Sequence, residues 1–188
     1  MKTRTILFAQ FGTRVGTRGE GRAAQKALWQ ELASLPEGGI LAADLSGIEV
    51  LSGSFADEAL VEPVARLVTG ELPGRYLVMR APREDLLDDL AAKLVQRKLA
   101  LLAMVDGKGC VLLGRLPRYL AESLQWIIAH GEATSGDLAQ AFGVSPRAAA
   151  TRIAQLAELR LIHVISQARP VGGLQHFARS LVSVDQDP

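Results

Sequence analysis

Cationic and polar side chains recur over residues 145–169 in a pattern suited to binding a polyanion. Five arginines and one glutamate lie between residues 145 and 180, a net charge of +4, whereas residues 117–144 have one arginine and three carboxylates, a net charge of −2. Guanidinium groups bind phosphates, and hydroxyl and amide side chains can read base edges. The candidate nucleic-acid contacts are Ser145, Arg147, Thr151, Arg152, Gln155, Arg160 and Arg169.

The other polar residues do not form a pattern that indicates catalysis. Asp57 and Glu58 are adjacent carboxylates, but adjacent side chains on a helix diverge by about 100° and do not share a site. No histidine lies within the first 116 residues, and the three in the chain, at positions 130, 163 and 176, do not have metal-ligand spacing. We therefore expect no enzymatic activity, no cofactor and no metal.

A second group of arginines lies in a glycine-rich segment, residues 12–22. Arg14, Arg18 and Arg22 alternate with glycines just before a predicted helix. Backbone amides and guanidinium groups at a helix N-terminus can bind an anion, so these three arginines form a candidate anion site. The glycine spacing matches neither the P-loop nor the dinucleotide fingerprint. The alternative interpretation is a flexible loop with solvated arginines.

Length and composition indicate a globular chain with one or two domains. Of its 188 residues, 48% are hydrophobic and 22% charged, and the net charge of +1 argues neither for nor against nucleic acid. The apolar runs are too short for a membrane span or a signal peptide. A single cysteine, Cys110, cannot form an internal disulfide. We expect a cytoplasmic protein with no membrane partner.

The basic segment needs a scaffold, and the pattern of residues 117–188 predicts one. Apolar periodicity predicts helices at 117–130, 135–142 and 146–159, then strands at 161–165 and 174–182. Gly143 suits the turn between the second and third helices, with Ser135 capping the second and Ser145, followed by Pro146, capping the third. This is the element order of a winged helix-turn-helix, which places its third helix in the DNA major groove.

Two features complicate that interpretation. Arg160 stands where winged helices often have a helix-ending glycine, and the chain has no asparagine, the residue that commonly reads adenine. Specificity would then depend on Arg147, Gln155, the wing around Arg169 and DNA shape. The alternative is a three-helix unit that docks a protein or only dimerises.

Residues 1–115 predict a different unit. Strands are expected at 3–9, 40–45, 74–79, 99–105 and 110–113, and helices at 21–35, 55–68 and 82–94. Alternating strands and helices predict an α/β layer. The fold class is therefore α/β (α+β), with an α/β domain over 1–115 and a winged-helix domain over 117–188.

The segment 41–60, Leu-Ala-Ala-Asp-Leu-Ser-Gly-Ile-Glu-Val-Leu-Ser-Gly-Ser-Phe-Ala-Asp-Glu-Ala-Leu, resembles the central strand, loop and helix of STAS-like domains, in the variety with Ser-Phe-Ala-Asp-Glu. The resemblance covers about residues 1–100. It implies a small domain that binds proteins or senses a ligand and is not catalytic, with Ser52, Ser54 and Asp57 in a regulatory loop. Anti-sigma-factor antagonists of this family have Asp-Ser-Ser or Asp-Ser-Gly there, with a phosphorylated serine; this chain lacks that aspartate. The alternative is a capping box of Ser54 and Asp57.

Together these features predict a bacterial transcription regulator that binds double-stranded DNA under the control of its N-terminal domain. A homodimer is expected, through the 117–130 helix or the 99–114 hairpin, and the STAS-like domain would bind a protein partner or a small ligand. Two alternatives stay open. One is a protein-interaction switch of the anti-sigma-factor-antagonist type without DNA binding, and the other is a nucleotide-responsive sensor that uses the 12–22 segment.

Overall fold

The computed structural model describes residues 2–168 and 174–183. The chain divides into two compact units, Met1–Arg115 and Leu116–Pro188. Both units combine helices with strands, so the chain is of the mixed α/β class. Among the described residues, no helix has both the length and the apolar character needed to cross a bilayer.

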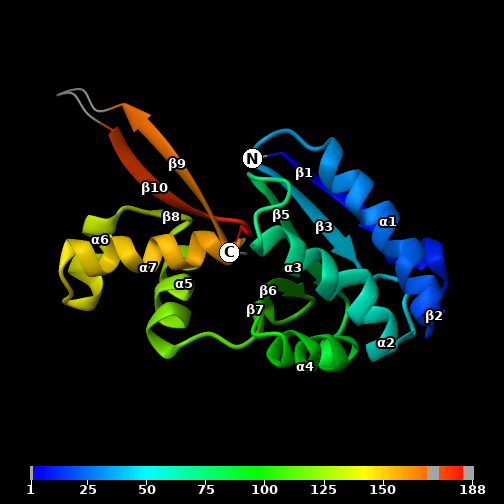
Figure 1. Ribbon diagram of the computed structural model, residues 1–188. Coiled ribbons are helices and arrows are strands. Elements are labelled where there is room, and N and C mark those ends of the chain that lie inside the picture. Colours follow the sequence, from blue (N-terminus) through cyan, green and yellow to red (C-terminus); the bar gives the residue numbers. More distant parts are fainter. Residues whose placement is uncertain (1, 169–173, 184–188) are drawn as a thin grey trace. The chain divides into compact units, whose positions relative to one another are not determined.

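The first unit is built on a five-stranded sheet in the order β1-β3-β5-β6-β7 (Figure 1). The first four strands in this order run parallel, and β7 returns antiparallel to β6 through the predicted hairpin. The strands are β1 (Thr3–Leu7), β3 (Gly39–Asp44), β5 (Arg75–Ala81), β6 (Ala100–Val105) and β7 (Gly109–Gly114). A separate two-stranded ribbon pairs β2 (Arg14–Val15) with β4 (Val50–Leu51), which the sequence did not predict.

Helices of this unit pack on one face of the sheet, where alternate strand residues such as Leu41, Ala43, Leu77 and Met79 join the core. The helical segments are η1 (Phe8–Phe11), α1 (Arg18–Ser34), α2 (Gly53–Ala56), the π segment η2 (Asp57–Val61), α3 (Glu62–Val68), η3 (Glu84–Leu87) and α4 (Asp88–Gln96). The sequence predicted single helices at 55–68 and 82–94; the first contains the π segment, and the second begins with a 3-10 turn.

Helix α1 begins at Arg18, three residues earlier than predicted, because Thr17 and Glu20 form a capping box. The Glu20 amide donates to Thr17 Oγ1 (3.2 Å), and the Thr17 amide donates to Glu20 Oε2 (2.9 Å). Gly21 therefore lies inside the helix. A Cβ there would lie 2.9 Å from Glu58 Cβ and 3.0 Å from the Phe55 carbonyl oxygen, so this glycine permits the close approach of α1 to α2 and η2.

The predicted capping box of Ser54 and Asp57 is wrong, because the helix begins two residues before residue 55. Ser52 is the N-cap: its hydroxyl accepts from the Phe55 amide (3.2 Å) and donates to the Gly16 carbonyl (2.7 Å). Ser54 is exposed within the first turn. Asp57 begins the π segment, where it pairs with Arg97 Nη2 at 2.9 Å.

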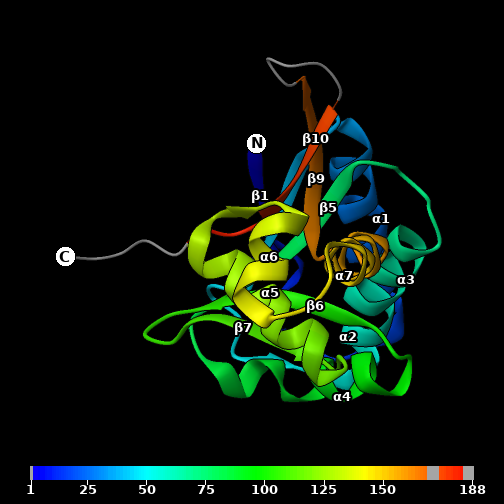
Figure 2. The ribbon, with the colours of Figure 1, turned by 90° about the vertical axis from the view of Figure 1, so that its left-hand side faces the viewer.

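In the described residues, the second unit contains three helices and a three-stranded sheet in the order β8-β10-β9 (Figure 1). Figure 2 shows β9 and β10 of this sheet side by side. Its elements are α5 (Arg118–His130), β8 (Glu132–Ala133), α6 (Ser135–Phe142), α7 (Pro146–Glu158), β9 (Ile162–Ala168) and β10 (Leu174–Ser180). The three predicted helices are confirmed to within one residue at each end. The two-residue strand β8 was not predicted.

Helix caps fix the α6–α7 corner. Thr134 caps α6, not Ser135 as predicted, because Thr134 and Asp137 form a second capping box: the Asp137 amide donates to Thr134 Oγ1 (3.2 Å) and the Thr134 amide to Asp137 Oδ2 (2.7 Å). Gly143 follows α6 in the left-handed region, with a φ of 62°. Ser145 caps α7 as predicted, accepting from the Ala148 amide at 3.2 Å, with Pro146 at the first helical position.

Candidate nucleic-acid interface

Helix α7 presents one exposed and one buried face. Ala149, Ile153 and Leu156 are buried in the second unit, as the apolar spacing predicts. Arg147 and Thr151 are exposed, and so are the small residues at positions 148, 150 and 154. The Thr151 hydroxyl donates to the Arg147 backbone carbonyl (3.0 Å). Among the described residues, no carboxylate forms an ion pair with Arg147.

A groove of about 530 Å³ lies between the start of α5 and the exposed face of α7. Tyr119 of α5 lies at this groove, 41% exposed, and its hydroxyl donates to Gln155 Oε1 at 3.4 Å. The lining residues are Tyr119, Ser145, Arg147, Ala148, Thr151, Arg152 and Gln155. The groove thus brings together five of the predicted contact residues and adds Tyr119, which sequence reasoning missed.

Arg152 lies at the groove and also contacts α5 and α6. Its Nη1 donates to Ser123 Oγ (3.2 Å), and its guanidinium carbon lies 5.4 Å from the ring centres of both Tyr119 and Phe142. Ser123 is itself buried and donates to the Tyr119 carbonyl (2.8 Å). Arg152 therefore links α7 to α5 and α6 by cation–π and hydrogen-bond contacts, and it also lines the groove.

Arg160 ends α7 in the left-handed conformation, with a φ of 58°. Its amide donates to the Ala157 carbonyl and the Leu161 amide to the Leu156 carbonyl, both at 3.0 Å, which is the hydrogen-bond pattern of a Schellman motif. The conformation that glycine usually provides is therefore adopted by an arginine, at a cost of about 1 kcal/mol.

The hairpin β9–β10 follows α7, and its outer described pairs are polar except for Leu174 opposite Ala168. Ser166 and His176 are exposed cross-strand neighbours, and Ser166 Oγ lies 2.9 Å from His176 Nδ1. Arg179 pairs with Glu132 at 3.0 Å, so its charge is balanced within the unit. Arg169, expected at the tip of the wing, lies outside the described residues.

Within the predicted anion site at residues 12–22, two backbone amides bind a carboxylate of the same segment. The amides of Gly16 and Thr17 both donate to Glu20 Oε2, at 3.2 and 2.9 Å. These bonds, the Thr17 amide first, hold the pKa of Glu20 below its ordinary value. Arg14 lies 3.4 Å from Glu49, and Arg18 and Arg22 are exposed. The segment is not a loop throughout, because it contains β2 and the start of α1, and its free amides are fewer than the sequence indicates.

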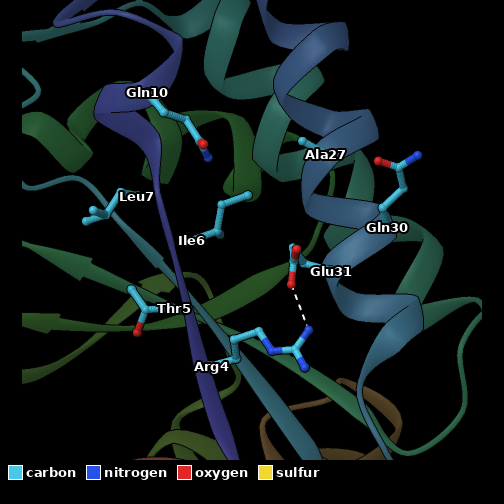
Figure 3. A pocket seen from close by; sticks show the side chains of 8 residues that line it. All are labelled: Arg4, Thr5, Ile6, Leu7, Gln10, Ala27, Gln30 and Glu31. Carbon is cyan, nitrogen blue, oxygen red and sulfur yellow. Dashed lines mark hydrogen bonds and ion pairs between the residues drawn. The ribbon is translucent and has the colours of Figure 1, made fainter.

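The first unit has a pocket of about 440 Å³ between its edge strand β1 and helix α1 (Figure 3). Arg4 of β1 reaches across to α1, where its Nη1 contacts Glu31 Oε2 (2.8 Å) and Ser34 Oγ (2.7 Å). The pocket is lined by Arg4, Thr5, Ile6, Leu7, Gln10, Ala27, Gln30 and Glu31. Because Arg4 and Glu31 neutralise each other, the pocket offers amide and hydroxyl groups and not a net charge.

The described residues offer little for metal or thiol chemistry. No group of histidine, cysteine, aspartate and glutamate side chains in them could hold a metal ion. Burial raises the pKa of the half-buried Cys110 thiol to about 11, which keeps it protonated at neutral pH. In comparisons with known proteins, no family model and no curated relative matches this chain. The geometry of the α7 face is thus the most specific indication of function.

Proposed function

We propose that the chain is a bacterial transcription regulator whose second unit binds double-stranded DNA as a winged helix-turn-helix. The observation that carries the proposal is the exposed face of α7, where Arg147, Thr151 and Gln155 surround a groove at the capped start of the helix. The element order supports it: helix, short strand, two helices joined at a left-handed glycine, then a hairpin.

The residues suggest how such a face would bind. The start of α7 has a partial positive charge from its helix dipole, and Arg147 adds a full one, so a phosphate would be favoured there. Thr151 and Gln155 can exchange hydrogen bonds with base edges. The small exposed side chains at 148, 150 and 154 would allow α7 to come close to the base pairs in the DNA major groove. Tyr119 holds the Gln155 amide through its hydroxyl and thereby limits its orientations.

The first unit is proposed to act as a STAS-like domain that binds a protein partner or small ligand, without catalysis, and controls a cytoplasmic homodimer. The structure gives less support to Ser52 as a regulated serine than the resemblance implies, because its hydroxyl is hydrogen-bonded to the Gly16 carbonyl and the Phe55 amide. A nucleotide sensor at residues 12–22 is the weaker alternative, since Glu20 uses two of the amides that a phosphate would need.

One observation favours the other alternative, a protein-interaction switch without DNA binding. Two of the five arginines between residues 145 and 180 contact other side chains of the second unit: Arg152 binds Ser123, and Arg179 pairs with Glu132. The cationic surface is therefore smaller than the sequence count suggests. A docking surface for protein needs less positive charge than one for DNA.

A selection experiment with a matched variant separates the two. Purified full-length protein is incubated with sheared genomic DNA at low salt, the retained fragments are sequenced, and affinity for them is measured by fluorescence anisotropy. Arg147→Ala is expected to weaken binding about tenfold or more. Arg22→Ala, which removes the same charge from an exposed site on α1, is the control and is expected to change little. Failure of the wild-type protein to retain any fragment would reject DNA binding.

A further inference from the structure

Strand β1 lies at one edge of the five-stranded sheet, and none of the described strands pairs with its outer side (Figure 1). The Ile40 amide donates to the Lys2 carbonyl (3.0 Å), and Thr3 is in register with Ile40 and Thr5 with Ala42. In a parallel ladder, alternate residues bond to the neighbouring strand. Residues 2, 4 and 6 therefore face β3, and the amides and carbonyls of Thr3, Thr5 and Leu7 face outward.

This edge is open to an added strand. Thr3, Thr5 and Leu7 are all exposed, Leu7 by 53%. The opposite edge strand, β7, has no exposed residue. An exposed edge strand is a template for pairing with another chain.

We propose that two copies of this chain pair their β1 strands antiparallel across a twofold axis at Thr5, which makes one continuous sheet. With this axis, Thr5 faces Thr5 and Thr3 faces Leu7, so each outward residue exchanges its amide and carbonyl with the other copy. The outward set is thus its own complement. A twofold interface requires that property.

The charges fit the same register. Arg4 of one copy lies opposite Ile6 of the other, so the two arginines do not face each other, and each is already paired with Glu31 of its own chain. Like charges directly opposite would destabilise the pairing.

The side chains on the α1 side of the sheet stay with their own chain in the pair. Arg4 is held by Glu31 (Figure 3) and Ser34 of α1, and Ile6 is buried in the core. The pairing therefore uses the outward backbone groups of β1 and the exposed side chains of Thr3, Thr5 and Leu7.

Proline at position 5 tests the backbone contact. Because the Thr5 amide faces away from β3, Thr5→Pro keeps the existing ladder but removes a donor from each copy at the axis. Sedimentation velocity of the full-length chain is expected to show a wild-type dimer and a self-association about tenfold or more weaker in Thr5→Pro. Thr5→Val keeps the amide and the branched shape and serves as the control, while far-UV circular dichroism checks that both variants are folded.

Charge exchange tests the axis itself. Thr5→Lys and Thr5→Glu each place like charges opposite one another and are expected to be monomeric, whereas their mixture is expected to form heterodimers. A monomeric wild type, a dimer unaffected by Thr5→Pro, or a mixture that stays monomeric would each overturn the proposal. A dimer unaffected by Thr5→Pro would indicate that the two copies meet elsewhere, at α5 or at the β6–β7 hairpin. The proposed pairing rests on the proposed function only in that a homodimer is expected there. All measurements are made without DNA, so a failure to dimerise through β1 is distinguishable from a failure to bind DNA.

Discussion

Arg147 and Arg152 lie five residues apart on the same helix, yet their surroundings differ. The guanidinium of Arg147 is exposed, whereas that of Arg152 is half-buried, with Tyr119, Phe142 and Ser123 around it. A desolvated guanidinium over aromatic rings stabilises the fold, whereas an exposed one is available to a ligand.

Arg152→Ala is therefore expected to lower the free energy of unfolding by about 1–2 kcal/mol, because it removes a hydrogen bond and two cation–π contacts. Arg147→Ala is expected to change it by less than about 0.5 kcal/mol. Thermal and urea denaturation followed by circular dichroism measures both. Equal stability of the two variants would contradict the packing role assigned to Arg152.

Arg160 provides a second contrast between stability and binding. Arg160→Gly relieves the left-handed conformation of an L-residue and is expected to stabilise the protein by about 0.5–1 kcal/mol. If the side chain also contacts a DNA phosphate, the same variant binds DNA less tightly. A variant with a raised melting temperature and lowered DNA affinity would support both roles, and a lowered melting temperature would show that contacts of the arginine side chain outweigh the backbone strain.

At the level of elements, helices α1, α6 and α7 each begin with a side-chain N-cap. Helix α6 has a reciprocal box of Thr134 and Asp137, and the hydrogen bonds from Thr134, the side chain first, hold the pKa of Asp137 below its ordinary value. A carboxyl with a lowered folded-state pKa stabilises the protein above its unfolded pKa, near 4, and this contribution is lost as pH falls through the folded value.

Asp137→Ala is accordingly expected to cost about 0.5–1 kcal/mol at pH 7, a modest value because the group is exposed. The difference from wild type should shrink as the pH is lowered below about 4, since the wild-type carboxyl is then protonated. Urea denaturation at a series of pH values measures this convergence. A difference that stays constant down to pH 2 would show that the ionised carboxylate is not the stabilising form.

Periodicity predicted the long elements of both units, because each buries a regular apolar face. Predicted strands of the central sheet agree with the structure to within two residues at each end. The predicted start of α1 is three residues too late, and the predicted N-cap of α6 is Ser135 where the structure has Thr134, although the Thr-x-x-Glu and Thr-x-x-Asp patterns are present in the sequence. The strands β2, β4 and β8 have two residues each, which is too short to show a hydrophobic period. Their pairing also depends on segments distant in the sequence.

The candidate site was predicted in part for the same reason. Helical spacing placed Arg147, Thr151 and Gln155 on one face of α7. Tyr119 is next to the apolar stripe of α5, and only the crossing of α5 over α7 brings it to Gln155 and turns Arg152 inward. Such contacts between helices distant in sequence cannot be inferred from the pattern of either helix alone.

For the whole molecule, a net charge of +1 means that the proposed binding to DNA would depend on local contacts and not on overall charge. Binding is expected to weaken with salt, with a slope of log affinity against log salt of about −0.9 per neutralised phosphate. Arg147→Ala should reduce this slope by about one for each subunit engaged, and Arg22→Ala should leave it unchanged. Anisotropy titrations between low and moderate salt give the slopes. An Arg147→Ala slope equal to that of wild type would place this side chain away from the phosphates.

Cys110 gives the protein a practical advantage for optical work. A thiol with a pKa of about 11 reacts slowly with maleimide dyes near neutral pH, because so little of it is ionised. A cysteine introduced at the exposed Ala150 would be labelled far faster, so the wild-type cysteine need not be replaced. A single fluorophore on α7 could then report the approach of a ligand to this helix in otherwise native protein.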